Sequence, residues 1–178
     1  LADEETYPGV EQALTMPDGN IYSMPYISGM DFLPLAVGTR MFLNAKWLED
    51  LNLEMPTTID EFYDVLKAFK EQDPNGNGKA DELPWAPPSP ASAINTIRGA
   101  WGLGNRGTHN GDIDYDEEEG KIRFIPVDPR YREVLEFAHK TYKEGLMDEE
   151  VFINDNSLIG AKGSQNLLGT IIAPGTTY

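Results

Sequence analysis

Apolar residues recur at helical spacing in two segments of the chain, and each segment follows a capping pattern. Between residues 59 and 71 apolar side chains fall every three or four positions, as in a helix that buries one face. Thr58 stands before this segment and Glu61 three positions later, as in a capping box. A second segment with the same period follows Asp128 and a proline, and Gly145 is its expected stop. The pattern therefore predicts two amphipathic helices.

Shorter apolar runs predict the elements between and around these helices. Residues 21–26 follow an Asp-Gly turn and predict a strand, and residues 40–44 predict another. Residues 121–125 alternate between apolar and basic side chains, which indicates a half-exposed strand behind an acidic turn. Shorter helices are expected over residues 46–51 and about 92–101. A chain of 178 residues is long enough for one domain with a sizeable core.

Directly after the first long helix, residues 73–82 read DPNGNGKADE and place side-chain oxygens at alternate positions. Asp73, Asn75 and Asn77 follow this rhythm, and Gly78 in the sixth place permits a sharp backbone turn. Hard divalent cations take such oxygen ligands, and calcium is the cation that this spacing favours. The alternative is a plain turn, because Asp, Asn and Gly also favour turns.

This loop departs from an EF-hand at its closing end. An EF-hand closes with a bidentate Glu in the twelfth place, which is Pro84 in this chain. Asp81 and Glu82 are the nearest substitutes, and Lys79 stands where such loops donate a backbone carbonyl. The prolines that begin with Pro84 prevent a second helix directly behind the loop. We therefore expect a structural ion that pins a helix end, without a helix-pair switch.

Composition narrows the classes of function. The chain has 14 basic and 30 acidic residues, a net charge of −16, and no cysteine. Nucleic-acid binding depends on Lys and Arg that neutralise phosphates, so this balance argues against it. Without cysteine there are no disulfides or thiol nucleophiles, and the two histidines lack the spacing of zinc ligands. No apolar run approaches the ~20 residues of a transmembrane helix.

Five segments stand in an order that carries a resemblance. They are DGNIYSMPY at 18–26, MFLNAKWL at 41–48, PTTIDEF at 56–62, YREVLEF at 131–137 and YKEGLMD at 142–148. The chain resembles family 1 extracellular solute-binding proteins, the capture components of bacterial ABC importers for sugars. With the loop at 73–82, it is most similar to the subgroup of alginate-binding proteins and large oligosaccharide-binding lipoproteins. The resemblance covers most of residues 16–170.

The resemblance implies an α/β fold, one lobe of the type II periplasmic-binding-protein kind with a central sheet flanked by helices. Residues 1–178 are then expected to form a single domain, the main part of the C-terminal lobe. Residues 1–15 are a candidate extension from the other lobe. The calcium ligands of the subgroup carry over onto Asp73, Asn75, Asn77, the Lys79 carbonyl, Asp81 and Glu82.

The implied function is capture of a solute, in the first place an oligosaccharide, for the membrane permease of an ABC importer. No enzymatic activity is expected. The implied location is extracellular, as a cell-surface lipoprotein, or periplasmic, and the lipid anchor of the longer protein is expected outside this chain. The competing hypotheses are a calcium-stabilised secreted carbohydrate-active enzyme and a dockerin-like interaction module. No catalytic motif supports the former, and no second calcium loop supports the latter.

Candidate sugar contacts follow from the chemistry of sugar binding, in which aromatic faces and planar polar groups hold the ring. Trp101 lies beside Asn105 and Arg106 at the end of a predicted helix, as a platform with a polar pair. For Trp101, packing in the core is an equal alternative. The other candidates are Tyr22 and Tyr26 on the presumed crossover strand, and Arg40 before the second strand.

Overall fold

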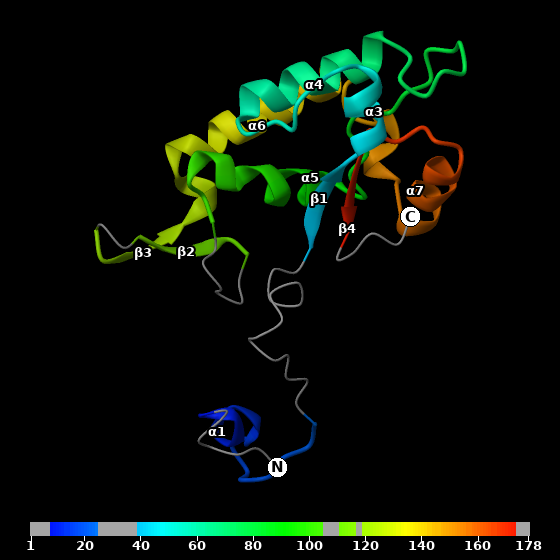
Figure 1. Ribbon diagram of the computed structural model, residues 1–178. Helices are drawn as coiled ribbons and strands as arrows, with labels where there is room; N and C mark the ends of the chain where they lie inside the picture. The colour runs from blue at the N-terminus through cyan, green and yellow to red at the C-terminus, as the bar shows by residue number, and fades with distance from the viewer. Residues whose placement is uncertain (1–7, 25–38, 105–110, 117–118, 174–178) are drawn as a thin grey trace. The chain divides into compact units, whose positions relative to one another are not determined.

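The computed structural model describes residues 8–24, 39–104, 111–116 and 119–173 (Figure 1). Contacts divide the chain into two compact units, Leu1–Gly38 and Thr39–Tyr178. The boundary between these two units falls after residue 38. In the part of the chain that the structure describes, no helix has both the length and the apolar character needed to cross a membrane.

In the first unit, helix α1 (Val10–Leu14) is followed by a tight turn in which Gly19 has a φ of 82°. The turn brings Ile21 back to Thr15 in an isolated antiparallel bridge. The prediction of a strand over residues 21–26 is therefore wrong for residues 22–24, which pair with no strand among the residues that the structure describes. Residues 25 and 26 lie outside the described part of the chain.

The second unit is built on a small central sheet. Strand β1 (Arg40–Leu43) pairs antiparallel with β4 (Thr170–Ala173), with Phe42 opposite Ile171. Two parallel bridges extend the sheet beyond β4, from Leu168 to Leu83 and from Trp85 to Met147. The strand predicted at residues 40–44 is confirmed, and it ends at Leu43 because Asn44 caps the next helix.

Helices α3 (Ala45–Asp50) and α4 (Ile59–Glu71) follow β1 along the chain. Thr58 and Glu61 form the predicted capping box, and the Thr58 hydroxyl accepts from the Glu61 N–H at 3.2 Å. Helix α4 thus has the bounds that its apolar period predicts. The buried side chains of α4 are Phe62, Val65, Leu66, Ala68 and Phe69.

Helix α5 (Pro90–Ile97) continues into a 3-10 helix, η1 (Arg98–Trp101), and α6 (Pro129–Lys143) contacts both. Helices α5 and α6 each have proline as their first residue, and a capping side chain precedes each of them: Ser89 before α5 and Asp128 before α6. The Arg130 guanidinium hydrogen-bonds the Asp128 carboxylate and lowers its pKa to about 2. Both helices confirm the sequence predictions, and Ser89 explains why α5 begins two residues early.

Strands β2 (Ile113–Asp116) and β3 (Lys121–Phe124) form an antiparallel hairpin, followed by a short 3-10 helix, η2 (Ile125–Val127). The sequence analysis predicts β3 but not β2, because it assigns the acidic segment before residue 121 to a turn. Arg123 of β3 explains the acidic strand, since it lies opposite Asp114 and forms an ion pair with it. Its Nη1 atom also lies 3.5 Å from Asp116.

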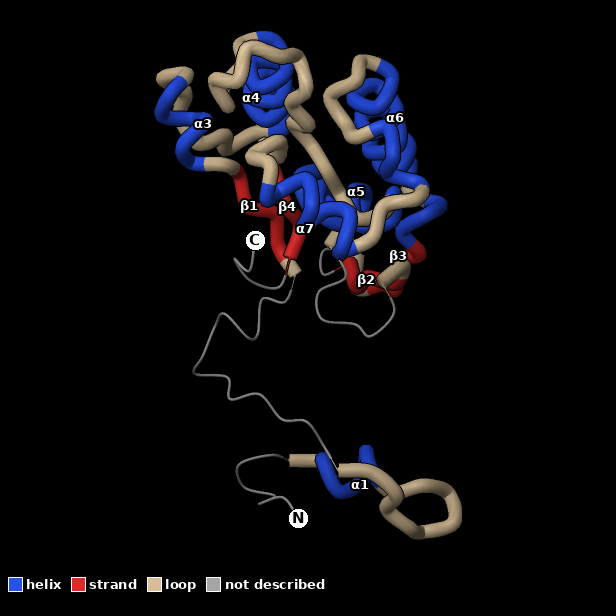
Figure 2. The backbone as a smooth tube through the Cα atoms, turned by 90° about the vertical axis from the view of Figure 1, so that its right-hand side faces the viewer, coloured by secondary structure: helices blue, strands red, loops and turns tan. Residues whose placement is uncertain are grey.

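A 3-10 helix, η3 (Glu149–Phe152), and helix α7 (Asn156–Ser164) complete the lobe. The sequence analysis predicts neither, and Ile159 is the one buried residue of α7. Ile159 belongs to a small buried cluster against which Ile171 of β4 packs, and Figure 2 shows α7 beside the β1–β4 sheet. These helices complete an α/β lobe with a central sheet, as the resemblance implies.

The main core joins the helices to the sheet through aromatic contacts. Trp85 is fully buried, and its ring lies 5.7 Å from that of Phe62 on α4. The Phe137 ring of α6 lies 6.3 Å from Trp85. Because Trp85 follows the acidic loop by three residues, packing of this ring fixes the chain just beyond the loop.

Gly169 lies where the chain enters β4 beside α4, and we expect Gly169→Ala to be destabilising. A Cβ atom there would lie 2.5 Å from Phe69 Cδ2 and 2.7 Å from the Pro84 carbonyl oxygen, which cannot rotate away. Overpacking of this kind lowers the free energy of unfolding by about 1–3 kcal/mol, measurable by urea denaturation. Gly99→Ala is the control, because no atom lies within 4 Å of that position. Equal losses in the two variants would contradict the prediction.

Candidate functional site

The acidic loop at residues 73–82 curls sharply at the end of α4. Asp73, Gly76 and Gly78 have positive φ angles of 48°, 69° and 75°. Glycine adopts such angles without a steric penalty, and Asp is one of the few other residues that tolerate them. Gly78 therefore provides the turn that its place in the loop predicts, and Gly76 and Asp73 add to it.

Side-chain oxygens of the loop face the loop's own backbone. The Asp73 carboxylate accepts from the N–H groups of Asn77 and Gly78, at 3.1 and 3.0 Å. The Asn75 side-chain oxygen accepts from Asn77 N–H at 3.0 Å, and the Asn77 oxygen accepts from Lys79 N–H at 2.8 Å. The side-chain oxygens of the three alternate residues thus all accept hydrogen bonds from main-chain N–H groups within the loop.

Asp81 closes this arrangement from the far side of the loop. Its carboxylate accepts from the side-chain amides of Asn77 and Asn75, at 3.0 and 3.2 Å. These hydrogen bonds, that from Asn77 above all, lower the pKa of Asp81. Asp81 is therefore held as a carboxylate beside the two amides.

Glu82 differs from the other acids of the loop because it is buried, with 1% of its surface exposed. Among the described residues, neither of its carboxylate oxygens has a hydrogen-bond partner. Burial raises the pKa of Glu82, and the nearby charges of Asp73 and Asp81 raise it further. Lys70 Nζ donates to the main-chain carbonyl of Glu82 at 3.2 Å. An unpaired buried carboxylate is costly, and a divalent cation is a group that would offset this cost.

The residues of the loop fit a hard divalent cation through a mixed set of ligands. Within the described residues, no three acidic, histidine or cysteine side chains gather into a cluster that could hold a metal. Hard cations also take amide and main-chain carbonyl oxygens, which Asn75, Asn77 and Lys79 can supply here. A cation held here would therefore depend on uncharged oxygens as much as on the carboxylates.

Trp101 is partly buried against the core and is not a fully exposed aromatic platform. It ends η1 and is half-buried, and its ring contacts Phe137 edge-on at a centroid distance of 5.8 Å. Its carbonyl oxygen accepts from Arg130 Nη1 at 3.4 Å. Trp101 thus packs against the main core while part of its surface stays accessible.

Of the other predicted sugar contacts, the structure describes Tyr22 and Arg40. Tyr22 belongs to the first unit, is 72% exposed and donates its hydroxyl to Asp18 at 2.6 Å. Arg40 is the first residue of β1. The remaining predicted contacts, Asn105, Arg106 and Tyr26, lie outside the described residues.

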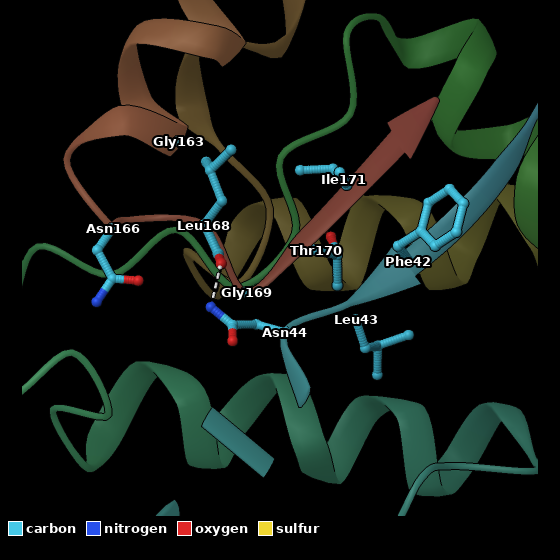
Figure 3. A pocket seen from close by; sticks show the side chains of 9 residues that line it. All are labelled: Phe42, Leu43, Asn44, Gly163, Asn166, Leu168, Gly169, Thr170 and Ile171. Carbon is cyan, nitrogen blue, oxygen red and sulfur yellow. Dashed lines mark hydrogen bonds between the residues drawn. The ribbon is translucent and has the colours of Figure 1, made fainter. Parts of the chain in front are cut away.

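A pocket that the sequence analysis misses opens beside the end of β1 and the start of β4, with a volume of about 370 Å³ (Figure 3). Phe42, Ile171 and the amides of Asn44 and Asn166 are among its lining groups. Asn44 donates to the Leu168 carbonyl oxygen at 3.2 Å. No lining side chain is ionisable, so the pocket suits packing or binding and lacks acid–base groups. No sequence signal marks it, because its two sides come from distant segments.

No protein-family model matches the chain. It is 34% identical over 175 residues to the fructooligosaccharide ABC transporter substrate-binding protein FusA of Streptococcus pneumoniae, covering 95% of this chain and 31% of that protein. It is 32% identical over 141 residues to lipoprotein LipO of Bacillus subtilis, covering 76% of this chain and 26% of LipO. The chain thus spans less than a third of the length of these relatives.

Solved structures agree with the sequence matches. FusA in complex with kestose superposes with a TM-score of 0.79 and 32% identity, covering 97% of this chain and 35% of that one. An EF-hand mutant of FusA in complex with fructo-nystose covers the same shares, with a TM-score of 0.68 and 28% identity. The alginate-binding protein AlgQ2 without calcium ion has a TM-score of 0.74 and 32% identity, covering 96% and 33%.

Proposed function

Because the chain is homologous over nearly its whole length to substrate-binding proteins of ABC transporters, we propose that it forms the main part of the C-terminal lobe of such a protein. In this role it captures an oligosaccharide together with a second lobe. The observation that carries the proposal is the match to FusA bound to kestose, with a TM-score of 0.79 over 97% of the chain. These relatives are binding proteins, which favours solute capture over the enzyme and dockerin-like alternatives.

The partners and location of the protein follow from the same role. The lobe would present its solute to the membrane permease of an ABC importer, on the outer side of the membrane. Similarity to lipoprotein LipO supports attachment of the longer protein to the cell surface through a lipid. The net charge of −16 argues against nucleic-acid partners, because binding to nucleic acid needs basic residues that neutralise phosphates.

Calcium is proposed as a structural support at the loop 73–82. When bound, the ion supplies positive charge that offsets the repulsion among Asp73, Asp81 and Glu82. The unpartnered, buried carboxylate of Glu82 supports this assignment, as does the existence of an EF-hand mutant of FusA. The proposed ligands are Asp73, Asn75, Asn77, the Lys79 carbonyl, Asp81 and Glu82.

The proposed sugar contacts remain Trp101, Asn105, Arg106, Tyr22, Tyr26 and Arg40. Trp101 has the best structural support among those described, because its ring packs against Phe137 while part of the residue's surface stays accessible. An aromatic ring that is held from behind presents its face at a low entropic cost, which suits stacking on a sugar.

The function is tested by calorimetry with kestose as the probe, on the longer protein and on residues 1–178 alone. We expect saturable binding without released monosaccharide by the longer protein, and binding at least about 100-fold weaker by this chain. The reason is that a single lobe cannot bury the roughly 70–90% of a ligand's surface that a good site covers. Released fructose would favour an enzyme instead, and equal affinities would show that one lobe holds the whole site.

Trp101→Ala in the longer protein tests the proposed contact, with Tyr115→Ala as the matched control. Tyr115 is an exposed aromatic residue on the β2–β3 hairpin. We expect the first variant to weaken kestose binding and the second to leave it unchanged at the same melting temperature. An unchanged affinity in Trp101→Ala would assign this side chain to the core alone.

A further inference from the structure

The main chain turns sharply directly after Trp101. Gly102 has a φ of 70°, and its N–H donates to the Gly99 carbonyl at 2.9 Å. The Leu103 N–H donates to the Arg98 carbonyl at 3.2 Å, and the Leu103 side chain is fully buried. The carbonyl oxygens of Trp101 and Gly102 therefore lie at the end of η1, where no further helical turn supplies N–H donors.

Two arginine side chains provide donors for these carbonyls. Arg130 Nη1, from the first turn of α6, donates to the Trp101 carbonyl oxygen at 3.4 Å. Arg123 Nη2, from β3, donates to the Gly102 carbonyl oxygen at 3.1 Å. The Arg130 guanidinium also covers the turn, because a Cβ atom at Gly102 would lie 3.4 Å from Nη1. Two elements that lie 21 and 29 residues further along the chain thus contact consecutive carbonyls of the turn.

Asp128 fixes the orientation of the Arg130 guanidinium. Its carboxylate accepts from Arg130 Nε at 2.9 Å and from Arg130 Nη2 at 2.7 Å, which is a bidentate pair. The third nitrogen, Nη1, is the one that reaches Trp101. Arg123 Nη1 lies 3.7 Å from the same carboxylate, and Arg123 also pairs with the buried Asp114. Because the planar guanidinium is held along one side, its remaining N–H groups point in a fixed direction.

Helix α6 contacts Trp101 at two places. Phe137 packs edge-on against the Trp101 ring at a centroid distance of 5.8 Å, and Arg130 contacts the Trp101 carbonyl. These two residues of α6 are about two helical turns apart, so they lie on the same face of the helix. The ring and the main chain of Trp101 are therefore both held by one helix.

We propose that Arg130 is a positioning residue for oligosaccharide binding, because it holds Trp101 in the orientation in which the ring stacks on a sugar. This inference rests on the proposed function, in which Trp101 is a sugar contact. A side chain that is fixed before binding loses less conformational freedom when the ligand arrives, which favours binding. The Arg130 charge is already paired with Asp128, so the residue acts through Trp101 and not through an ion pair with the ligand.

A double-mutant cycle on the longer protein tests this role, with kestose as the probe. In the parent background, Arg130→Met is expected to weaken binding by about 2- to 10-fold, the cost of immobilising one side chain when the ligand binds. In the Trp101→Ala background the same substitution should leave the affinity unchanged, since no ring is left to position. Equal weakening in the two backgrounds, or no weakening in the parent, would overturn the inference.

Arg132→Met is the matched control for this cycle. Arg132 lies on the same helix, its side chain is 84% exposed, and it pairs with Glu136 one turn further along. Its replacement removes the same charge, and we expect unchanged kestose binding in both backgrounds. A loss of affinity equal to that of Arg130→Met would assign the effect to net charge and overturn the inference.

The orientation of Trp101 is measured separately by fluorine NMR of the protein labelled with fluorotryptophan, in which Trp101→Phe identifies the resonance. The parent and Arg132→Met should give one sharp Trp101 resonance, and Arg130→Met a broadened or divided one. A lower melting temperature with an unchanged Trp101 resonance would assign Arg130 a structural role alone and overturn the inference. An altered resonance in Arg130→Met, in a parent that binds no kestose, would reject kestose as the ligand and support the positioning of Trp101.

Discussion

Replacing Lys162 by Met is expected to lower the free energy of unfolding by about 3 kcal/mol, because it leaves a buried carboxylate without its countercharge. Lys162 Nζ lies 2.5 Å from Asp148 Oδ2, and the two side chains are 14% and 3% exposed. Breaking a buried ion pair costs about 3–5 kcal/mol. A loss at the lower end is expected because Asp148 keeps hydrogen bonds from the Asn154 side chain and the Glu150 N–H, at 2.8 and 3.1 Å. Urea denaturation at neutral pH measures the loss.

Two comparisons show whether the unpaired Asp148 carboxylate causes the loss of stability. The double variant Lys162→Met with Asp148→Asn should recover most of the loss, since removal of both charges is close to neutral. In the parent chain, burial opposes ionisation of Asp148, but hydrogen bonds from Lys162 and Asn154 outweigh it and lower the pKa below 3.8. The stability that the pair contributes is therefore present above that pH and lost as pH falls below it. The difference between parent and Lys162→Met should shrink in acid, and a constant difference would contradict the mechanism.

The Lys162–Asp148 pair also shows why part of the fold escapes prediction from sequence. Helix α7 carries Lys162 but buries just Ile159, so its apolar residues define no face that a periodicity could reveal. It is held by contacts with residues far away along the chain, at Asp148 and in β4. Strand β2 is similar, because its acidic residues suit a strand once Arg123 lies opposite. In both cases the deciding contacts come from residues outside the element itself, which its own apolar pattern does not reveal.

Helix α4 illustrates the opposite case. Its start depends on a capping box, and its length depends on an apolar period, which are local features of residues 58–71. The loop that follows is local as well, because Asp73, Asn75 and Asn77 interact mainly with one another and with nearby backbone. The burial of Glu82 is not local. It depends on how the chain packs around Trp85, and the spacing of polar residues in the loop does not reveal that packing.

Removing calcium with EDTA is expected to destabilise the protein, by about 2.7 kcal/mol if calcium stands 100-fold above its dissociation constant and about 4.1 kcal/mol at 1,000-fold. The physical reason is that the ion would offset the burial of Glu82 and the repulsion from Asp73 and Asp81, the causes that raise the pKa of Glu82. Thermal melts with and without calcium measure the effect, which corresponds to a shift of about 5–15 °C for a chain of this size. An unchanged melting curve in EDTA would contradict a structural ion.

Glu82→Gln is a more specific test, because it should change the stability in opposite directions with and without the ion. In calcium the variant loses a charged ligand, so it should be less stable than the parent. In EDTA it replaces an unpartnered buried carboxylate by a neutral amide, so it should be as stable as the parent or more so. Glu71→Gln, an exposed acid at the end of α4, removes the same charge nearby and should keep the full response to EDTA. If both variants responded alike, net charge near the loop, and not ligation by Glu82, would account for the effect.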